Sequence, residues 1–346
     1  MTRRAAGLAC AAGLLAALLA VSAGSWGSGG SEARPISLVS PGAPAAGISA
    51  SGAWRPLRTA GLRRTEVGAA RIGRSIYVVG GFLDSTETTA AVERYDMGRD
   101  RWRRLPPMPI AVNHPAVAAL GGRLYVYGGY LDSTFGRVTA ALQRFDPAGR
   151  RWSLLRPSPT PRAAAAMAVL GGRLHVAGGV SGGTPLRKLE TYDVAARRWR
   201  AAPSMKVARE HIAAVAAGGG LYVLGGRTGA RNLDVVERFD RRRRRWARLP
   251  SMLHARSGFA AVAVRGRPVV VGGEELTPGG QTIRPVELFD PRSGRWRPLP
   301  GMRTPRHGLG AAALGRRVYA LQGGPTPGFA FSGATEFLDV PRRALR

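Results

Sequence analysis

The chain has 346 residues and a formal net charge of +31 at pH 7, and it contains 48 glycines and 25 prolines. This composition favours an all-β chain rich in turns over a helical one, because glycine and proline interrupt helices. The single cysteine, Cys10, lies in a segment that we expect to be removed, so disulfides, thiolate nucleophiles and cysteine metal sites are excluded from the mature chain.

The first 52 residues predict export. Residues 1–23 begin with two arginines, continue with an apolar stretch and end in small residues, which is the pattern of a secretory signal peptide. The alternative is an uncleaved membrane anchor, although the apolar stretch is slightly shorter than the ~20 residues that span a bilayer. Residues 24–52, rich in Gly, Ser, Ala and Pro, predict a flexible linker. We therefore expect an extracytoplasmic location: secreted, periplasmic or at the cell surface.

From residue 53 onward the chain repeats a pattern about every 48 residues: a double glycine, an aromatic–Asp pair, and a tryptophan seven positions after the aromatic residue. The double glycines are Gly80-Gly81, Gly128-Gly129, Gly178-Gly179, Gly225-Gly226 and Gly272-Gly273, with an imperfect copy at Gln322-Gly323-Gly324. The aromatic and tryptophan positions are Tyr95/Trp102, Phe145/Trp152, Tyr192/Trp199, Phe239/Trp246 and Phe289/Trp296. Such regularity predicts units that stack on their neighbours to bury their faces.

The third repeat shows the predicted unit most clearly. It contains four candidate strands, at residues 163–169, 174–177, 189–193 and 198–200. The double glycine lets the second strand bend and approach its neighbour closely, because no Cβ is in the way. The tyrosine and tryptophan supply large apolar faces that pack one unit on the next.

Double glycine, aromatic–Asp and tryptophan at this period resemble the kelch repeat, and the resemblance covers residues 53–340. It implies a six-bladed β-propeller of four-stranded kelch blades. The sixth copy has no tryptophan strand, but Trp54-Arg55-Pro56-Leu57 matches Trp296-Arg297-Pro298-Leu299. We therefore expect the strand at Trp54 to complete the last blade and close the ring without exposed edges. Residues 341–346 form a basic tail.

The same position, a few residues ahead of the inner strand, carries an arginine in five of the six repeats. These residues are Arg64, Arg162, Arg209, Arg256 and Arg306, with Val112 in the second repeat. Kelch domains often place arginine at this position, and clustered guanidinium groups can bind carboxylate or phosphate in bidentate fashion. We expect an arginine rim that binds a ligand. The alternative is that each arginine holds a neighbouring loop in place.

Two residues further along, the same strand face carries Glu66, His114 and His211, which predicts a carboxylate and two imidazoles facing the axis. Glu210 and His307 lie at the intermediate position and are expected to point away from the axis. Candidate acid–base residues are therefore Glu66, His114, Glu210 and His211. We expect no metal site, because ligands from blades one, two and four should lie far apart around the ring. The run Arg241–Arg245 fills a hairpin tip and is either a solvated turn or a contact to an anionic surface.

Kelch domains serve mainly as interaction modules, so the resemblance implies a non-catalytic protein, which the N-terminal residues predict to be exported, that binds a peptide, a glycan or a small acidic ligand at its arginine-rimmed face. It implies no cofactor, and a monomer whose partner is a protein, a peptide or an anionic glycan. Nucleic acid is not expected as a partner, and membrane contact would require an uncleaved signal or surface charge.

The alternative function is that of a carbohydrate isomerase or epimerase similar to the sialic-acid mutarotases, for which Glu66, Arg209 and Glu210 would be the residues to suspect. Galactose oxidase chemistry is excluded, because its copper site needs a cysteine. The third alternative is electrostatic adhesion to anionic cell-surface polymers, which the net charge of +31 would favour.

Overall fold

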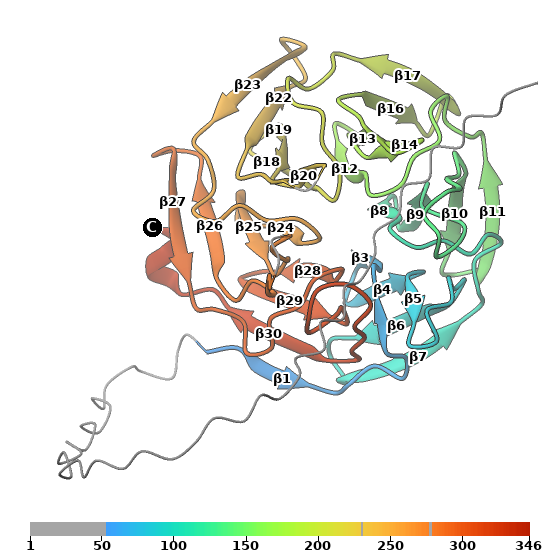
Figure 1. Cartoon of the computed structure of the whole chain (residues 1–346), viewed down its shortest axis with the longest axis horizontal. Helices are drawn as coiled ribbons and strands as arrows, with labels where there is room; N and C mark the ends of the chain where they lie inside the picture. The colour runs from blue at the N-terminus through green and yellow to red at the C-terminus, as the bar shows by residue number, and fades with distance from the viewer. Residues whose placement is uncertain (1–52, 230, 277–278) are drawn as a thin grey trace, which may run out of the picture. The chain divides into compact units, whose positions relative to one another are not determined.

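The computed structural model describes residues 53–229, 231–276 and 279–346. These residues form a ring of six four-stranded antiparallel sheets arranged around a central axis (Figure 1). The prediction of an all-β six-bladed propeller is confirmed. The predicted signal peptide and linker lie outside the described residues. Among the described residues, no helix has the length and apolar character needed to cross a membrane.

Each of the first three blades contains four strands of five residues that follow one another from the axis outward in chain order. The first contains β3 (Gly68–Ile72), β4 (Ser75–Val79), β6 (Val92–Asp96) and β7 (Arg101–Leu105). The second contains β8 (Ala116–Leu120), β9 (Arg123–Tyr127), β10 (Leu142–Asp146) and β11 (Arg151–Leu155). The third contains β12 (Ala166–Leu170), β13 (Arg173–Ala177), β16 (Leu189–Asp193) and β17 (Arg198–Ala202).

The next blades repeat this order, and the last one borrows a strand from the other end of the ring. The fourth contains β18 (Ala213–Ala217), β19 (Gly220–Leu224), β22 (Val236–Asp240) and β23 (Arg245–Leu249). The fifth contains β24 (Ala260–Val264), β25 (Arg267–Val271), β26 (Val286–Asp290) and β27 (Arg295–Leu299). The sixth contains β28 (Gly310–Leu314), β29 (Arg317–Leu321), β30 (Thr335–Asp339) and β1 (Arg55–Leu57).

The seam of the ring lies between β1 and β30, which are antiparallel with Arg55 opposite Phe337. Figure 1 shows β1 on the outside of the ring beside β30. Trp54 precedes β1, is buried, and donates from its indole nitrogen to the Pro300 carbonyl oxygen at 2.9 Å. The predicted closure by the Trp54 strand is therefore confirmed.

The repeated tryptophans tie each blade to the blade before it. In the first blade, Trp102 packs on Tyr95 with ring centroids 5.2 Å apart, and its indole nitrogen donates to the Arg58 carbonyl oxygen at 2.9 Å. The same indole-to-carbonyl bond recurs in the next four blades at Trp152, Trp199, Trp246 and Trp296. The apolar core accordingly lies between neighbouring sheets rather than in one central cluster.

The double glycines bring neighbouring blades into backbone contact. The second glycine of each pair donates its N–H to the carbonyl oxygen at the arginine position of the next blade, as Gly129 does to Arg162 at 3.0 Å. Gly323 closes this series by donating to Arg64 at 2.8 Å. A Cβ on Gly128 would lie 2.3 Å from the Arg162 carbonyl oxygen, so only glycine permits the approach.

The structure adds elements that the sequence does not predict. Three two-stranded sheets pair β2 (Arg64–Thr65) with β5 (Phe82–Leu83), β14 (Val180–Ser181) with β15 (Thr184–Pro185), and β20 (Arg227–Thr228) with β21 (Arg231–Asn232). The inner strand of blade three begins at Ala166 rather than at Ala163. The end of the chain forms a 3-10 helix, η1 (Arg342–Leu345), because Ala344 and Leu345 pack on the core of the last blades.

Candidate functional site

The five arginines before the inner strands are buried, which corrects the expectation of an exposed rim. Each guanidinium pairs with a glutamate from the third strand of its own blade; the pairs are Arg64–Glu93, Arg162–Glu190, Arg209–Glu237, Arg256–Glu287 and Arg306–Glu336. Arg209, with no exposed surface, also donates to the carbonyl oxygens of Gly225 and Val235 at 2.8 and 2.9 Å. These contacts agree with the alternative expectation, in which each arginine holds a neighbouring loop in place.

The second blade shows that the arginine and the glutamate act as a unit. It has Val112 at the arginine position and the neutral Gln143 at the glutamate position, and Gln143 makes two hydrogen bonds to the backbone of Ile110. Where the cation is missing, the carboxylate is missing too, because a lone buried carboxylate is costly. Burial lowers the pKa of Arg64 and Arg209 to about 10, and the paired carboxylates oppose this shift, so both remain charged at neutral pH.

A belt of backbone hydrogen bonds surrounds the axis two residues beyond the arginines. Its members share a left-handed backbone conformation, with φ between 50° and 60°: Glu66, His114, Ala164, His211, Gly258 and Gly308. From His114 to Gly308, each donates its N–H to the carbonyl oxygen of the equivalent residue in the preceding blade, at 2.7 to 3.2 Å, and Val67 closes the belt on Gly308. This belt holds the axial side chains in fixed positions.

Above the belt lies a cavity of about 480 Å³, which we call the axial pocket. Its lining residues come from all six blades: Thr65, Glu66, Phe82, His114, Tyr130, Phe135, Val180, Gly183, Glu210, His211, Arg227, Glu274, Leu276, His307, Pro327, Gly328 and Phe329. All four predicted acid–base candidates are among them. The five predicted arginines are not.

Glu210 and His307 point into the axial pocket, so the expectation that they face away is wrong. The left-handed residue that follows each of them interrupts the alternation of an ideal strand. Each instead forms an isolated β-bridge with the residue that follows the double-glycine position of its own blade. Glu210 pairs with Arg227, after Gly225-Gly226, and His307 pairs with Gly324, after Gln322-Gly323. The bridge lies at the pocket wall and not in the blade.

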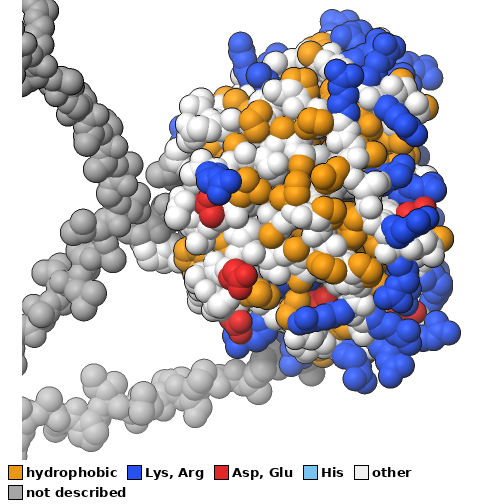
Figure 2. All heavy atoms as spheres, turned by 90° about the vertical axis from the view of Figure 1, so that its right-hand side faces the viewer, with side chains coloured by type: hydrophobic (Ala, Val, Ile, Leu, Met, Phe, Trp, Pro, Cys, Tyr) orange, Lys and Arg blue, Asp and Glu red, His pale blue; other side chains and the backbone are white. Residues whose placement is uncertain are grey.

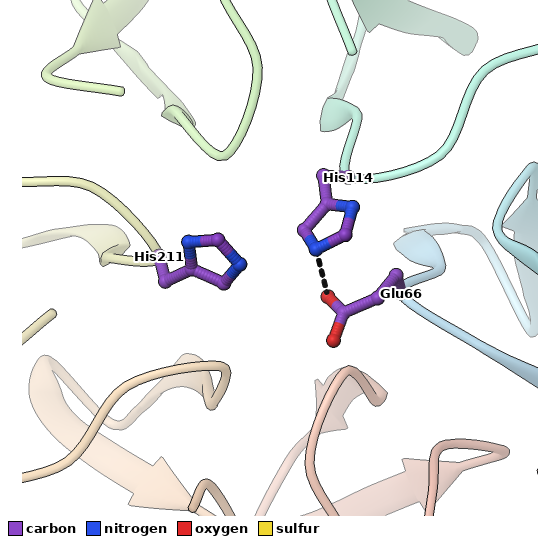
Figure 3. Close-up of side chains that lie close together, drawn as sticks. All are labelled: Glu66, His114 and His211. Atoms are coloured by element: carbon purple, nitrogen blue, oxygen red, sulfur yellow. Dashed lines mark ion pairs between the residues drawn. The ribbon is translucent and has the colours of Figure 1, made fainter. Parts of the chain in front are cut away.

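Glu66, His114 and His211 lie together at the pocket floor, so the expectation that they are far apart is also wrong. One ligand atom of each lies within 4.8 Å of the others (Figure 3). The inner strands converge at the axis, which brings blades one, two and four into contact there. The Glu66 carboxyl is 3.1 Å from His114 Nε2, and the two imidazole rings are 4.7 Å apart edge to face.

A charged network continues from the floor to one wall. Glu210 lies between His211 and Arg227, at 2.5 Å from the Nδ1 of one and 2.5 Å from the Nε of the other. Glu274 lies 3.9 Å from Arg227 and 3.9 Å from His307, whose Nε2 is 3.5 Å from Glu66. Glu210 and Glu274 therefore share the guanidinium of Arg227.

Burial and charge displace several pKa values in the pocket. Burial and the nearby Glu274 raise the pKa of Glu66 to about 8, so its carboxyl is largely protonated at neutral pH. Burial also lowers the pKa of His114 well below its ordinary value and lowers that of His307. Burial opposes the ionisation of Glu210, but His211 and Arg227 outweigh it and lower its pKa to about 2.

The opposite wall is aromatic. Phe82, Tyr130, Phe135 and Phe329 contact one another, with Phe135 stacked on Phe329 at 6.2 Å between centroids and 24° between ring planes. Phe135 and Phe329 are about half exposed, at 44% and 50%. The axial pocket thus combines an apolar wall with a hydrogen-bonding wall and floor.

Sequence reasoning missed Arg227, Glu274 and the aromatic residues. Most of these follow a double glycine directly: Phe82, Tyr130, Val180, Arg227 and Glu274. The repeat therefore carried a signal, since the residue after the glycines lines the pocket wall in each of the first five blades. Phe135 and Phe329 lie in loops of differing length and give no repeat signal.

The family described as the KLHDC2/KLHL20/DRC7 Kelch-repeats domain matches residues 66–273, and the Kelch motif matches residues 255–303. Among 813 matching chains of solved structures, the one titled "Structure of YjhT" is similar with a TM-score of 0.71 and 16% identity, over 81% of this chain and 95% of that chain. At that identity the likeness shows the fold alone. No curated protein matches the chain.

Proposed function

Because the chain belongs to the kelch-repeat family of β-propellers, we propose that it is a binding protein whose axial pocket takes a sugar or the end of a glycan. The observation that carries this proposal is the two-sided pocket, with the stacked Phe135 and Phe329 on one wall and Glu210 and Arg227 on the other. A sugar ring has an apolar face of C–H groups and an edge of hydroxyl groups, which match these two walls.

The charges favour a neutral ligand over an acidic one. Arg227, the one arginine among the described lining residues, is already paired with Glu210 at 2.5 Å and lies 3.9 Å from Glu274. An anionic ligand would have to compete with two carboxylates for that guanidinium. Hydroxyl groups can instead donate to the carboxylates and accept from the guanidinium without separating the existing pairs.

Binding is tested by titrating the chain with neutral sugars, amino sugars and acidic sugars, with calorimetry and the shift in melting temperature as readouts. We expect at least one neutral sugar or oligosaccharide to bind. Replacing Phe135 and Phe329 by serine should weaken binding about tenfold or more, because the apolar face of the sugar would no longer be buried. Both side chains are half exposed, so the fold should tolerate their loss.

The matched control is the pair Leu154→Ser and Leu253→Ser, which removes two exposed apolar side chains, 57% and 51% exposed, that do not line the pocket. Binding should be unchanged in this control. Failure of every sugar to bind would overturn the proposal. Binding of acidic sugars alone would overturn the charge argument and return the pocket to the acidic ligands expected from the sequence.

A second candidate function is catalysis on such a sugar, favoured by the Glu66–His114 pair. Opening a sugar hemiacetal requires one proton to reach the ring oxygen and another to leave the anomeric hydroxyl. Glu66 and His114 lie 3.1 Å apart on the pocket floor and can hold a proton between them. Catalysis predicts faster interconversion of anomers, followed by NMR, in the presence of the chain and loss of that acceleration in Glu66→Gln. An unchanged rate with the unsubstituted chain would leave binding as the function.

The proposal places the protein outside the cytoplasm, and this part rests on residues 1–23 alone. Mass spectrometry of the chain isolated from its own cells should find a mature N-terminus at Gly24. A chain that retains Met1 in the membrane fraction would indicate an uncleaved anchor instead.

A further inference from the structure

We propose that Glu66, His114 and His211 bind one divalent transition-metal ion, of which zinc is the first to test, at the floor of the axial pocket. Their ligand atoms lie within 4.8 Å of one another, and Figure 3 shows the three side chains directed at a common point. Two imidazoles and one carboxylate, with a cavity above them, are the donor set of open zinc and iron sites. The inference does not depend on the sugar proposal.

His211 is held in a fixed orientation by Glu210. Its Nδ1 lies 2.5 Å from the Glu210 carboxylate, which can only accept a hydrogen bond when ionised, so Nδ1 carries the proton. In the neutral imidazole the other ring nitrogen, Nε2, then keeps its lone pair. A carboxylate that holds the far nitrogen of an imidazole is the usual outer support of a histidine ligand.

His114 is oriented in the same way by the residue before it. Asn113 donates from its amide nitrogen to the Thr88 hydroxyl at 2.8 Å and to the Asp132 carbonyl oxygen at 3.0 Å, which leaves its oxygen facing His114. That oxygen is 2.6 Å from His114 Nδ1, so Nδ1 donates and Nε2 keeps its lone pair. In both histidines, which come from different blades, Nδ1 is thus bonded to a neighbouring side chain and Nε2 is left for a ligand.

The spacing is close to what a metal requires. His114 Nε2 and the nearest Glu66 oxygen are 3.1 Å apart. Ligands at ~2.0 Å from a tetrahedral zinc ion lie roughly 3.3 Å from one another. The backbone of all three residues is fixed by the axial belt, in which His114 donates to Glu66 at 3.0 Å. His211 supplies the third ligand atom, which lies within 4.8 Å of the other two.

Arg227 is the competitor for this site. Its Nη2 lies 3.3 Å from His211 Nε2 and can donate to the lone pair that the metal would use. The side chain is 22% exposed and lies at the pocket wall, so it can turn toward solvent when a cation binds. If the metal site exists, replacing Arg227 should strengthen metal binding, because the replacement removes both a positive charge and a competing hydrogen-bond donor.

The test is calorimetric titration of the full chain, made without a histidine tag and stripped with a chelator, against Zn²⁺, with Co²⁺ as a spectroscopic probe. We expect one ion per chain and the visible bands of a nitrogen-ligated Co²⁺. His114→Asn, His211→Asn and Glu66→Gln should each weaken Zn²⁺ binding more than tenfold. Glu210→Gln should weaken it by about 10- to 100-fold, as loss of an outer support does. Arg227→Met should tighten it.

The matched control is His254→Asn, which removes a half-exposed histidine outside the pocket and should leave binding unchanged. Circular dichroism checks that each variant is folded. The proposal is overturned if the unsubstituted chain takes up no stoichiometric Zn²⁺, if uptake survives the His114→Asn and His211→Asn changes together, or if bound Co²⁺ shows an oxygen-only spectrum. Sugar binding that persists in the metal-free chain would leave the proposed function intact whichever result is obtained.

Discussion

At the scale of single residues, the buried ion pairs explain why arginine recurs in the repeat. Arg209 makes four bonds in its own blade: to the carbonyl oxygens of Gly225, Val235 and Val223, and to Glu237 at 3.0 Å. These carbonyls belong to the second strand and to the chain entering the third, so one side chain fixes the path of both. The arginine position therefore holds the strands of its own blade together.

Removing one partner of such a pair should be costly. We expect Arg209→Met to lower the free energy of unfolding by about 3–5 kcal/mol, because Glu237 would be left as an unpaired buried charge. The double change Arg209→Met with Glu237→Leu should recover part of that loss. Urea unfolding at pH 7 measures both, with the exposed Arg200→Met as the control. A stable Arg209→Met variant that loses sugar binding would instead restore the expected ligand role.

His175 is another residue whose environment differs from that of its equivalents. It is buried on the second strand of blade three, where the other blades carry Tyr77, Tyr125, Tyr222, Tyr319 and Val269. Burial lowers the pKa of His175 below its ordinary value. The unfolded chain therefore binds a proton at this residue more readily than the folded chain does.

The sign of the resulting pH dependence follows from that difference. The stability that neutral His175 contributes is present above the unfolded pKa of ~6.5 and is lost as the pH falls below it. His175→Tyr should abolish this term and make blade three resemble the others. We expect the melting temperatures of the two proteins to diverge between pH 7.5 and pH 5.5, with the variant less sensitive to acid. Parallel curves would show that His175 does not titrate on unfolding.

At the scale of elements, the repeat spacing predicts the blades, but alternation along a strand does not predict the pocket. The glycine pairs and Trp54 indicate which strands pair. The first five blades are built from strands close together in the chain, and only the sixth is completed across the seam by β1. The alternation of an ideal strand gave the wrong direction for Glu210, because His211 adopts a left-handed backbone conformation that a histidine in the sequence does not indicate. That conformation directs the Glu210 side chain into the pocket. The burial of Arg209 could have been predicted, since arginine and glutamate are present or absent together in every repeat.

The seam makes the first strand a separable element. A chain that begins at residue 58 lacks β1 and the buried Trp54, and it exposes the edge of β30. Compared with a chain that begins at residue 49, we expect it to lose about 3–5 kcal/mol of stability, the usual cost of removing a buried tryptophan side chain. A synthetic peptide of residues 49–57 should restore part of the melting temperature by pairing with β30. Equal melting temperatures for the two chains would show that β1 does not hold the ring closed.

At the scale of the whole molecule, positive charge gathers on the exterior, while the described lining of the axial pocket holds one guanidinium shared by two carboxylates. Figure 2 shows one side of the ring, with lysine and arginine side chains in blue gathered along the right-hand edge and few acidic side chains among them. Exposed arginines occupy the hairpin tips between third and fourth strands, at Arg99, Arg150, Arg197 and 241–245. A field of this kind attracts polyanions regardless of their shape.

Adhesion through this field should be steeply salt dependent and indifferent to the pocket. Duplex DNA of random sequence is a convenient probe, because its charge density is known and each phosphate contact adds ~0.9 to the slope of log affinity against log salt. We expect tight binding at low salt that is lost as salt rises. Phe135→Ser with Phe329→Ser should leave this binding unchanged, whereas sugar binding should be insensitive to salt.

Two triple variants decide whether the run 241–245 is a dedicated contact. One replaces Arg241, Arg242 and Arg244 by glutamine, and the other replaces Arg99, Arg150 and Arg197, which removes the same charge from three separate hairpin tips. If the field is diffuse, both variants weaken DNA binding equally, because only the total charge near the surface matters. The first variant could instead show a larger fall in the slope of log affinity against log salt, close to the fall expected for three phosphate contacts. That result would show that this hairpin tip is a specific site for anions. We expect equal losses, because the exposed arginines recur at the tips of the neighbouring blades.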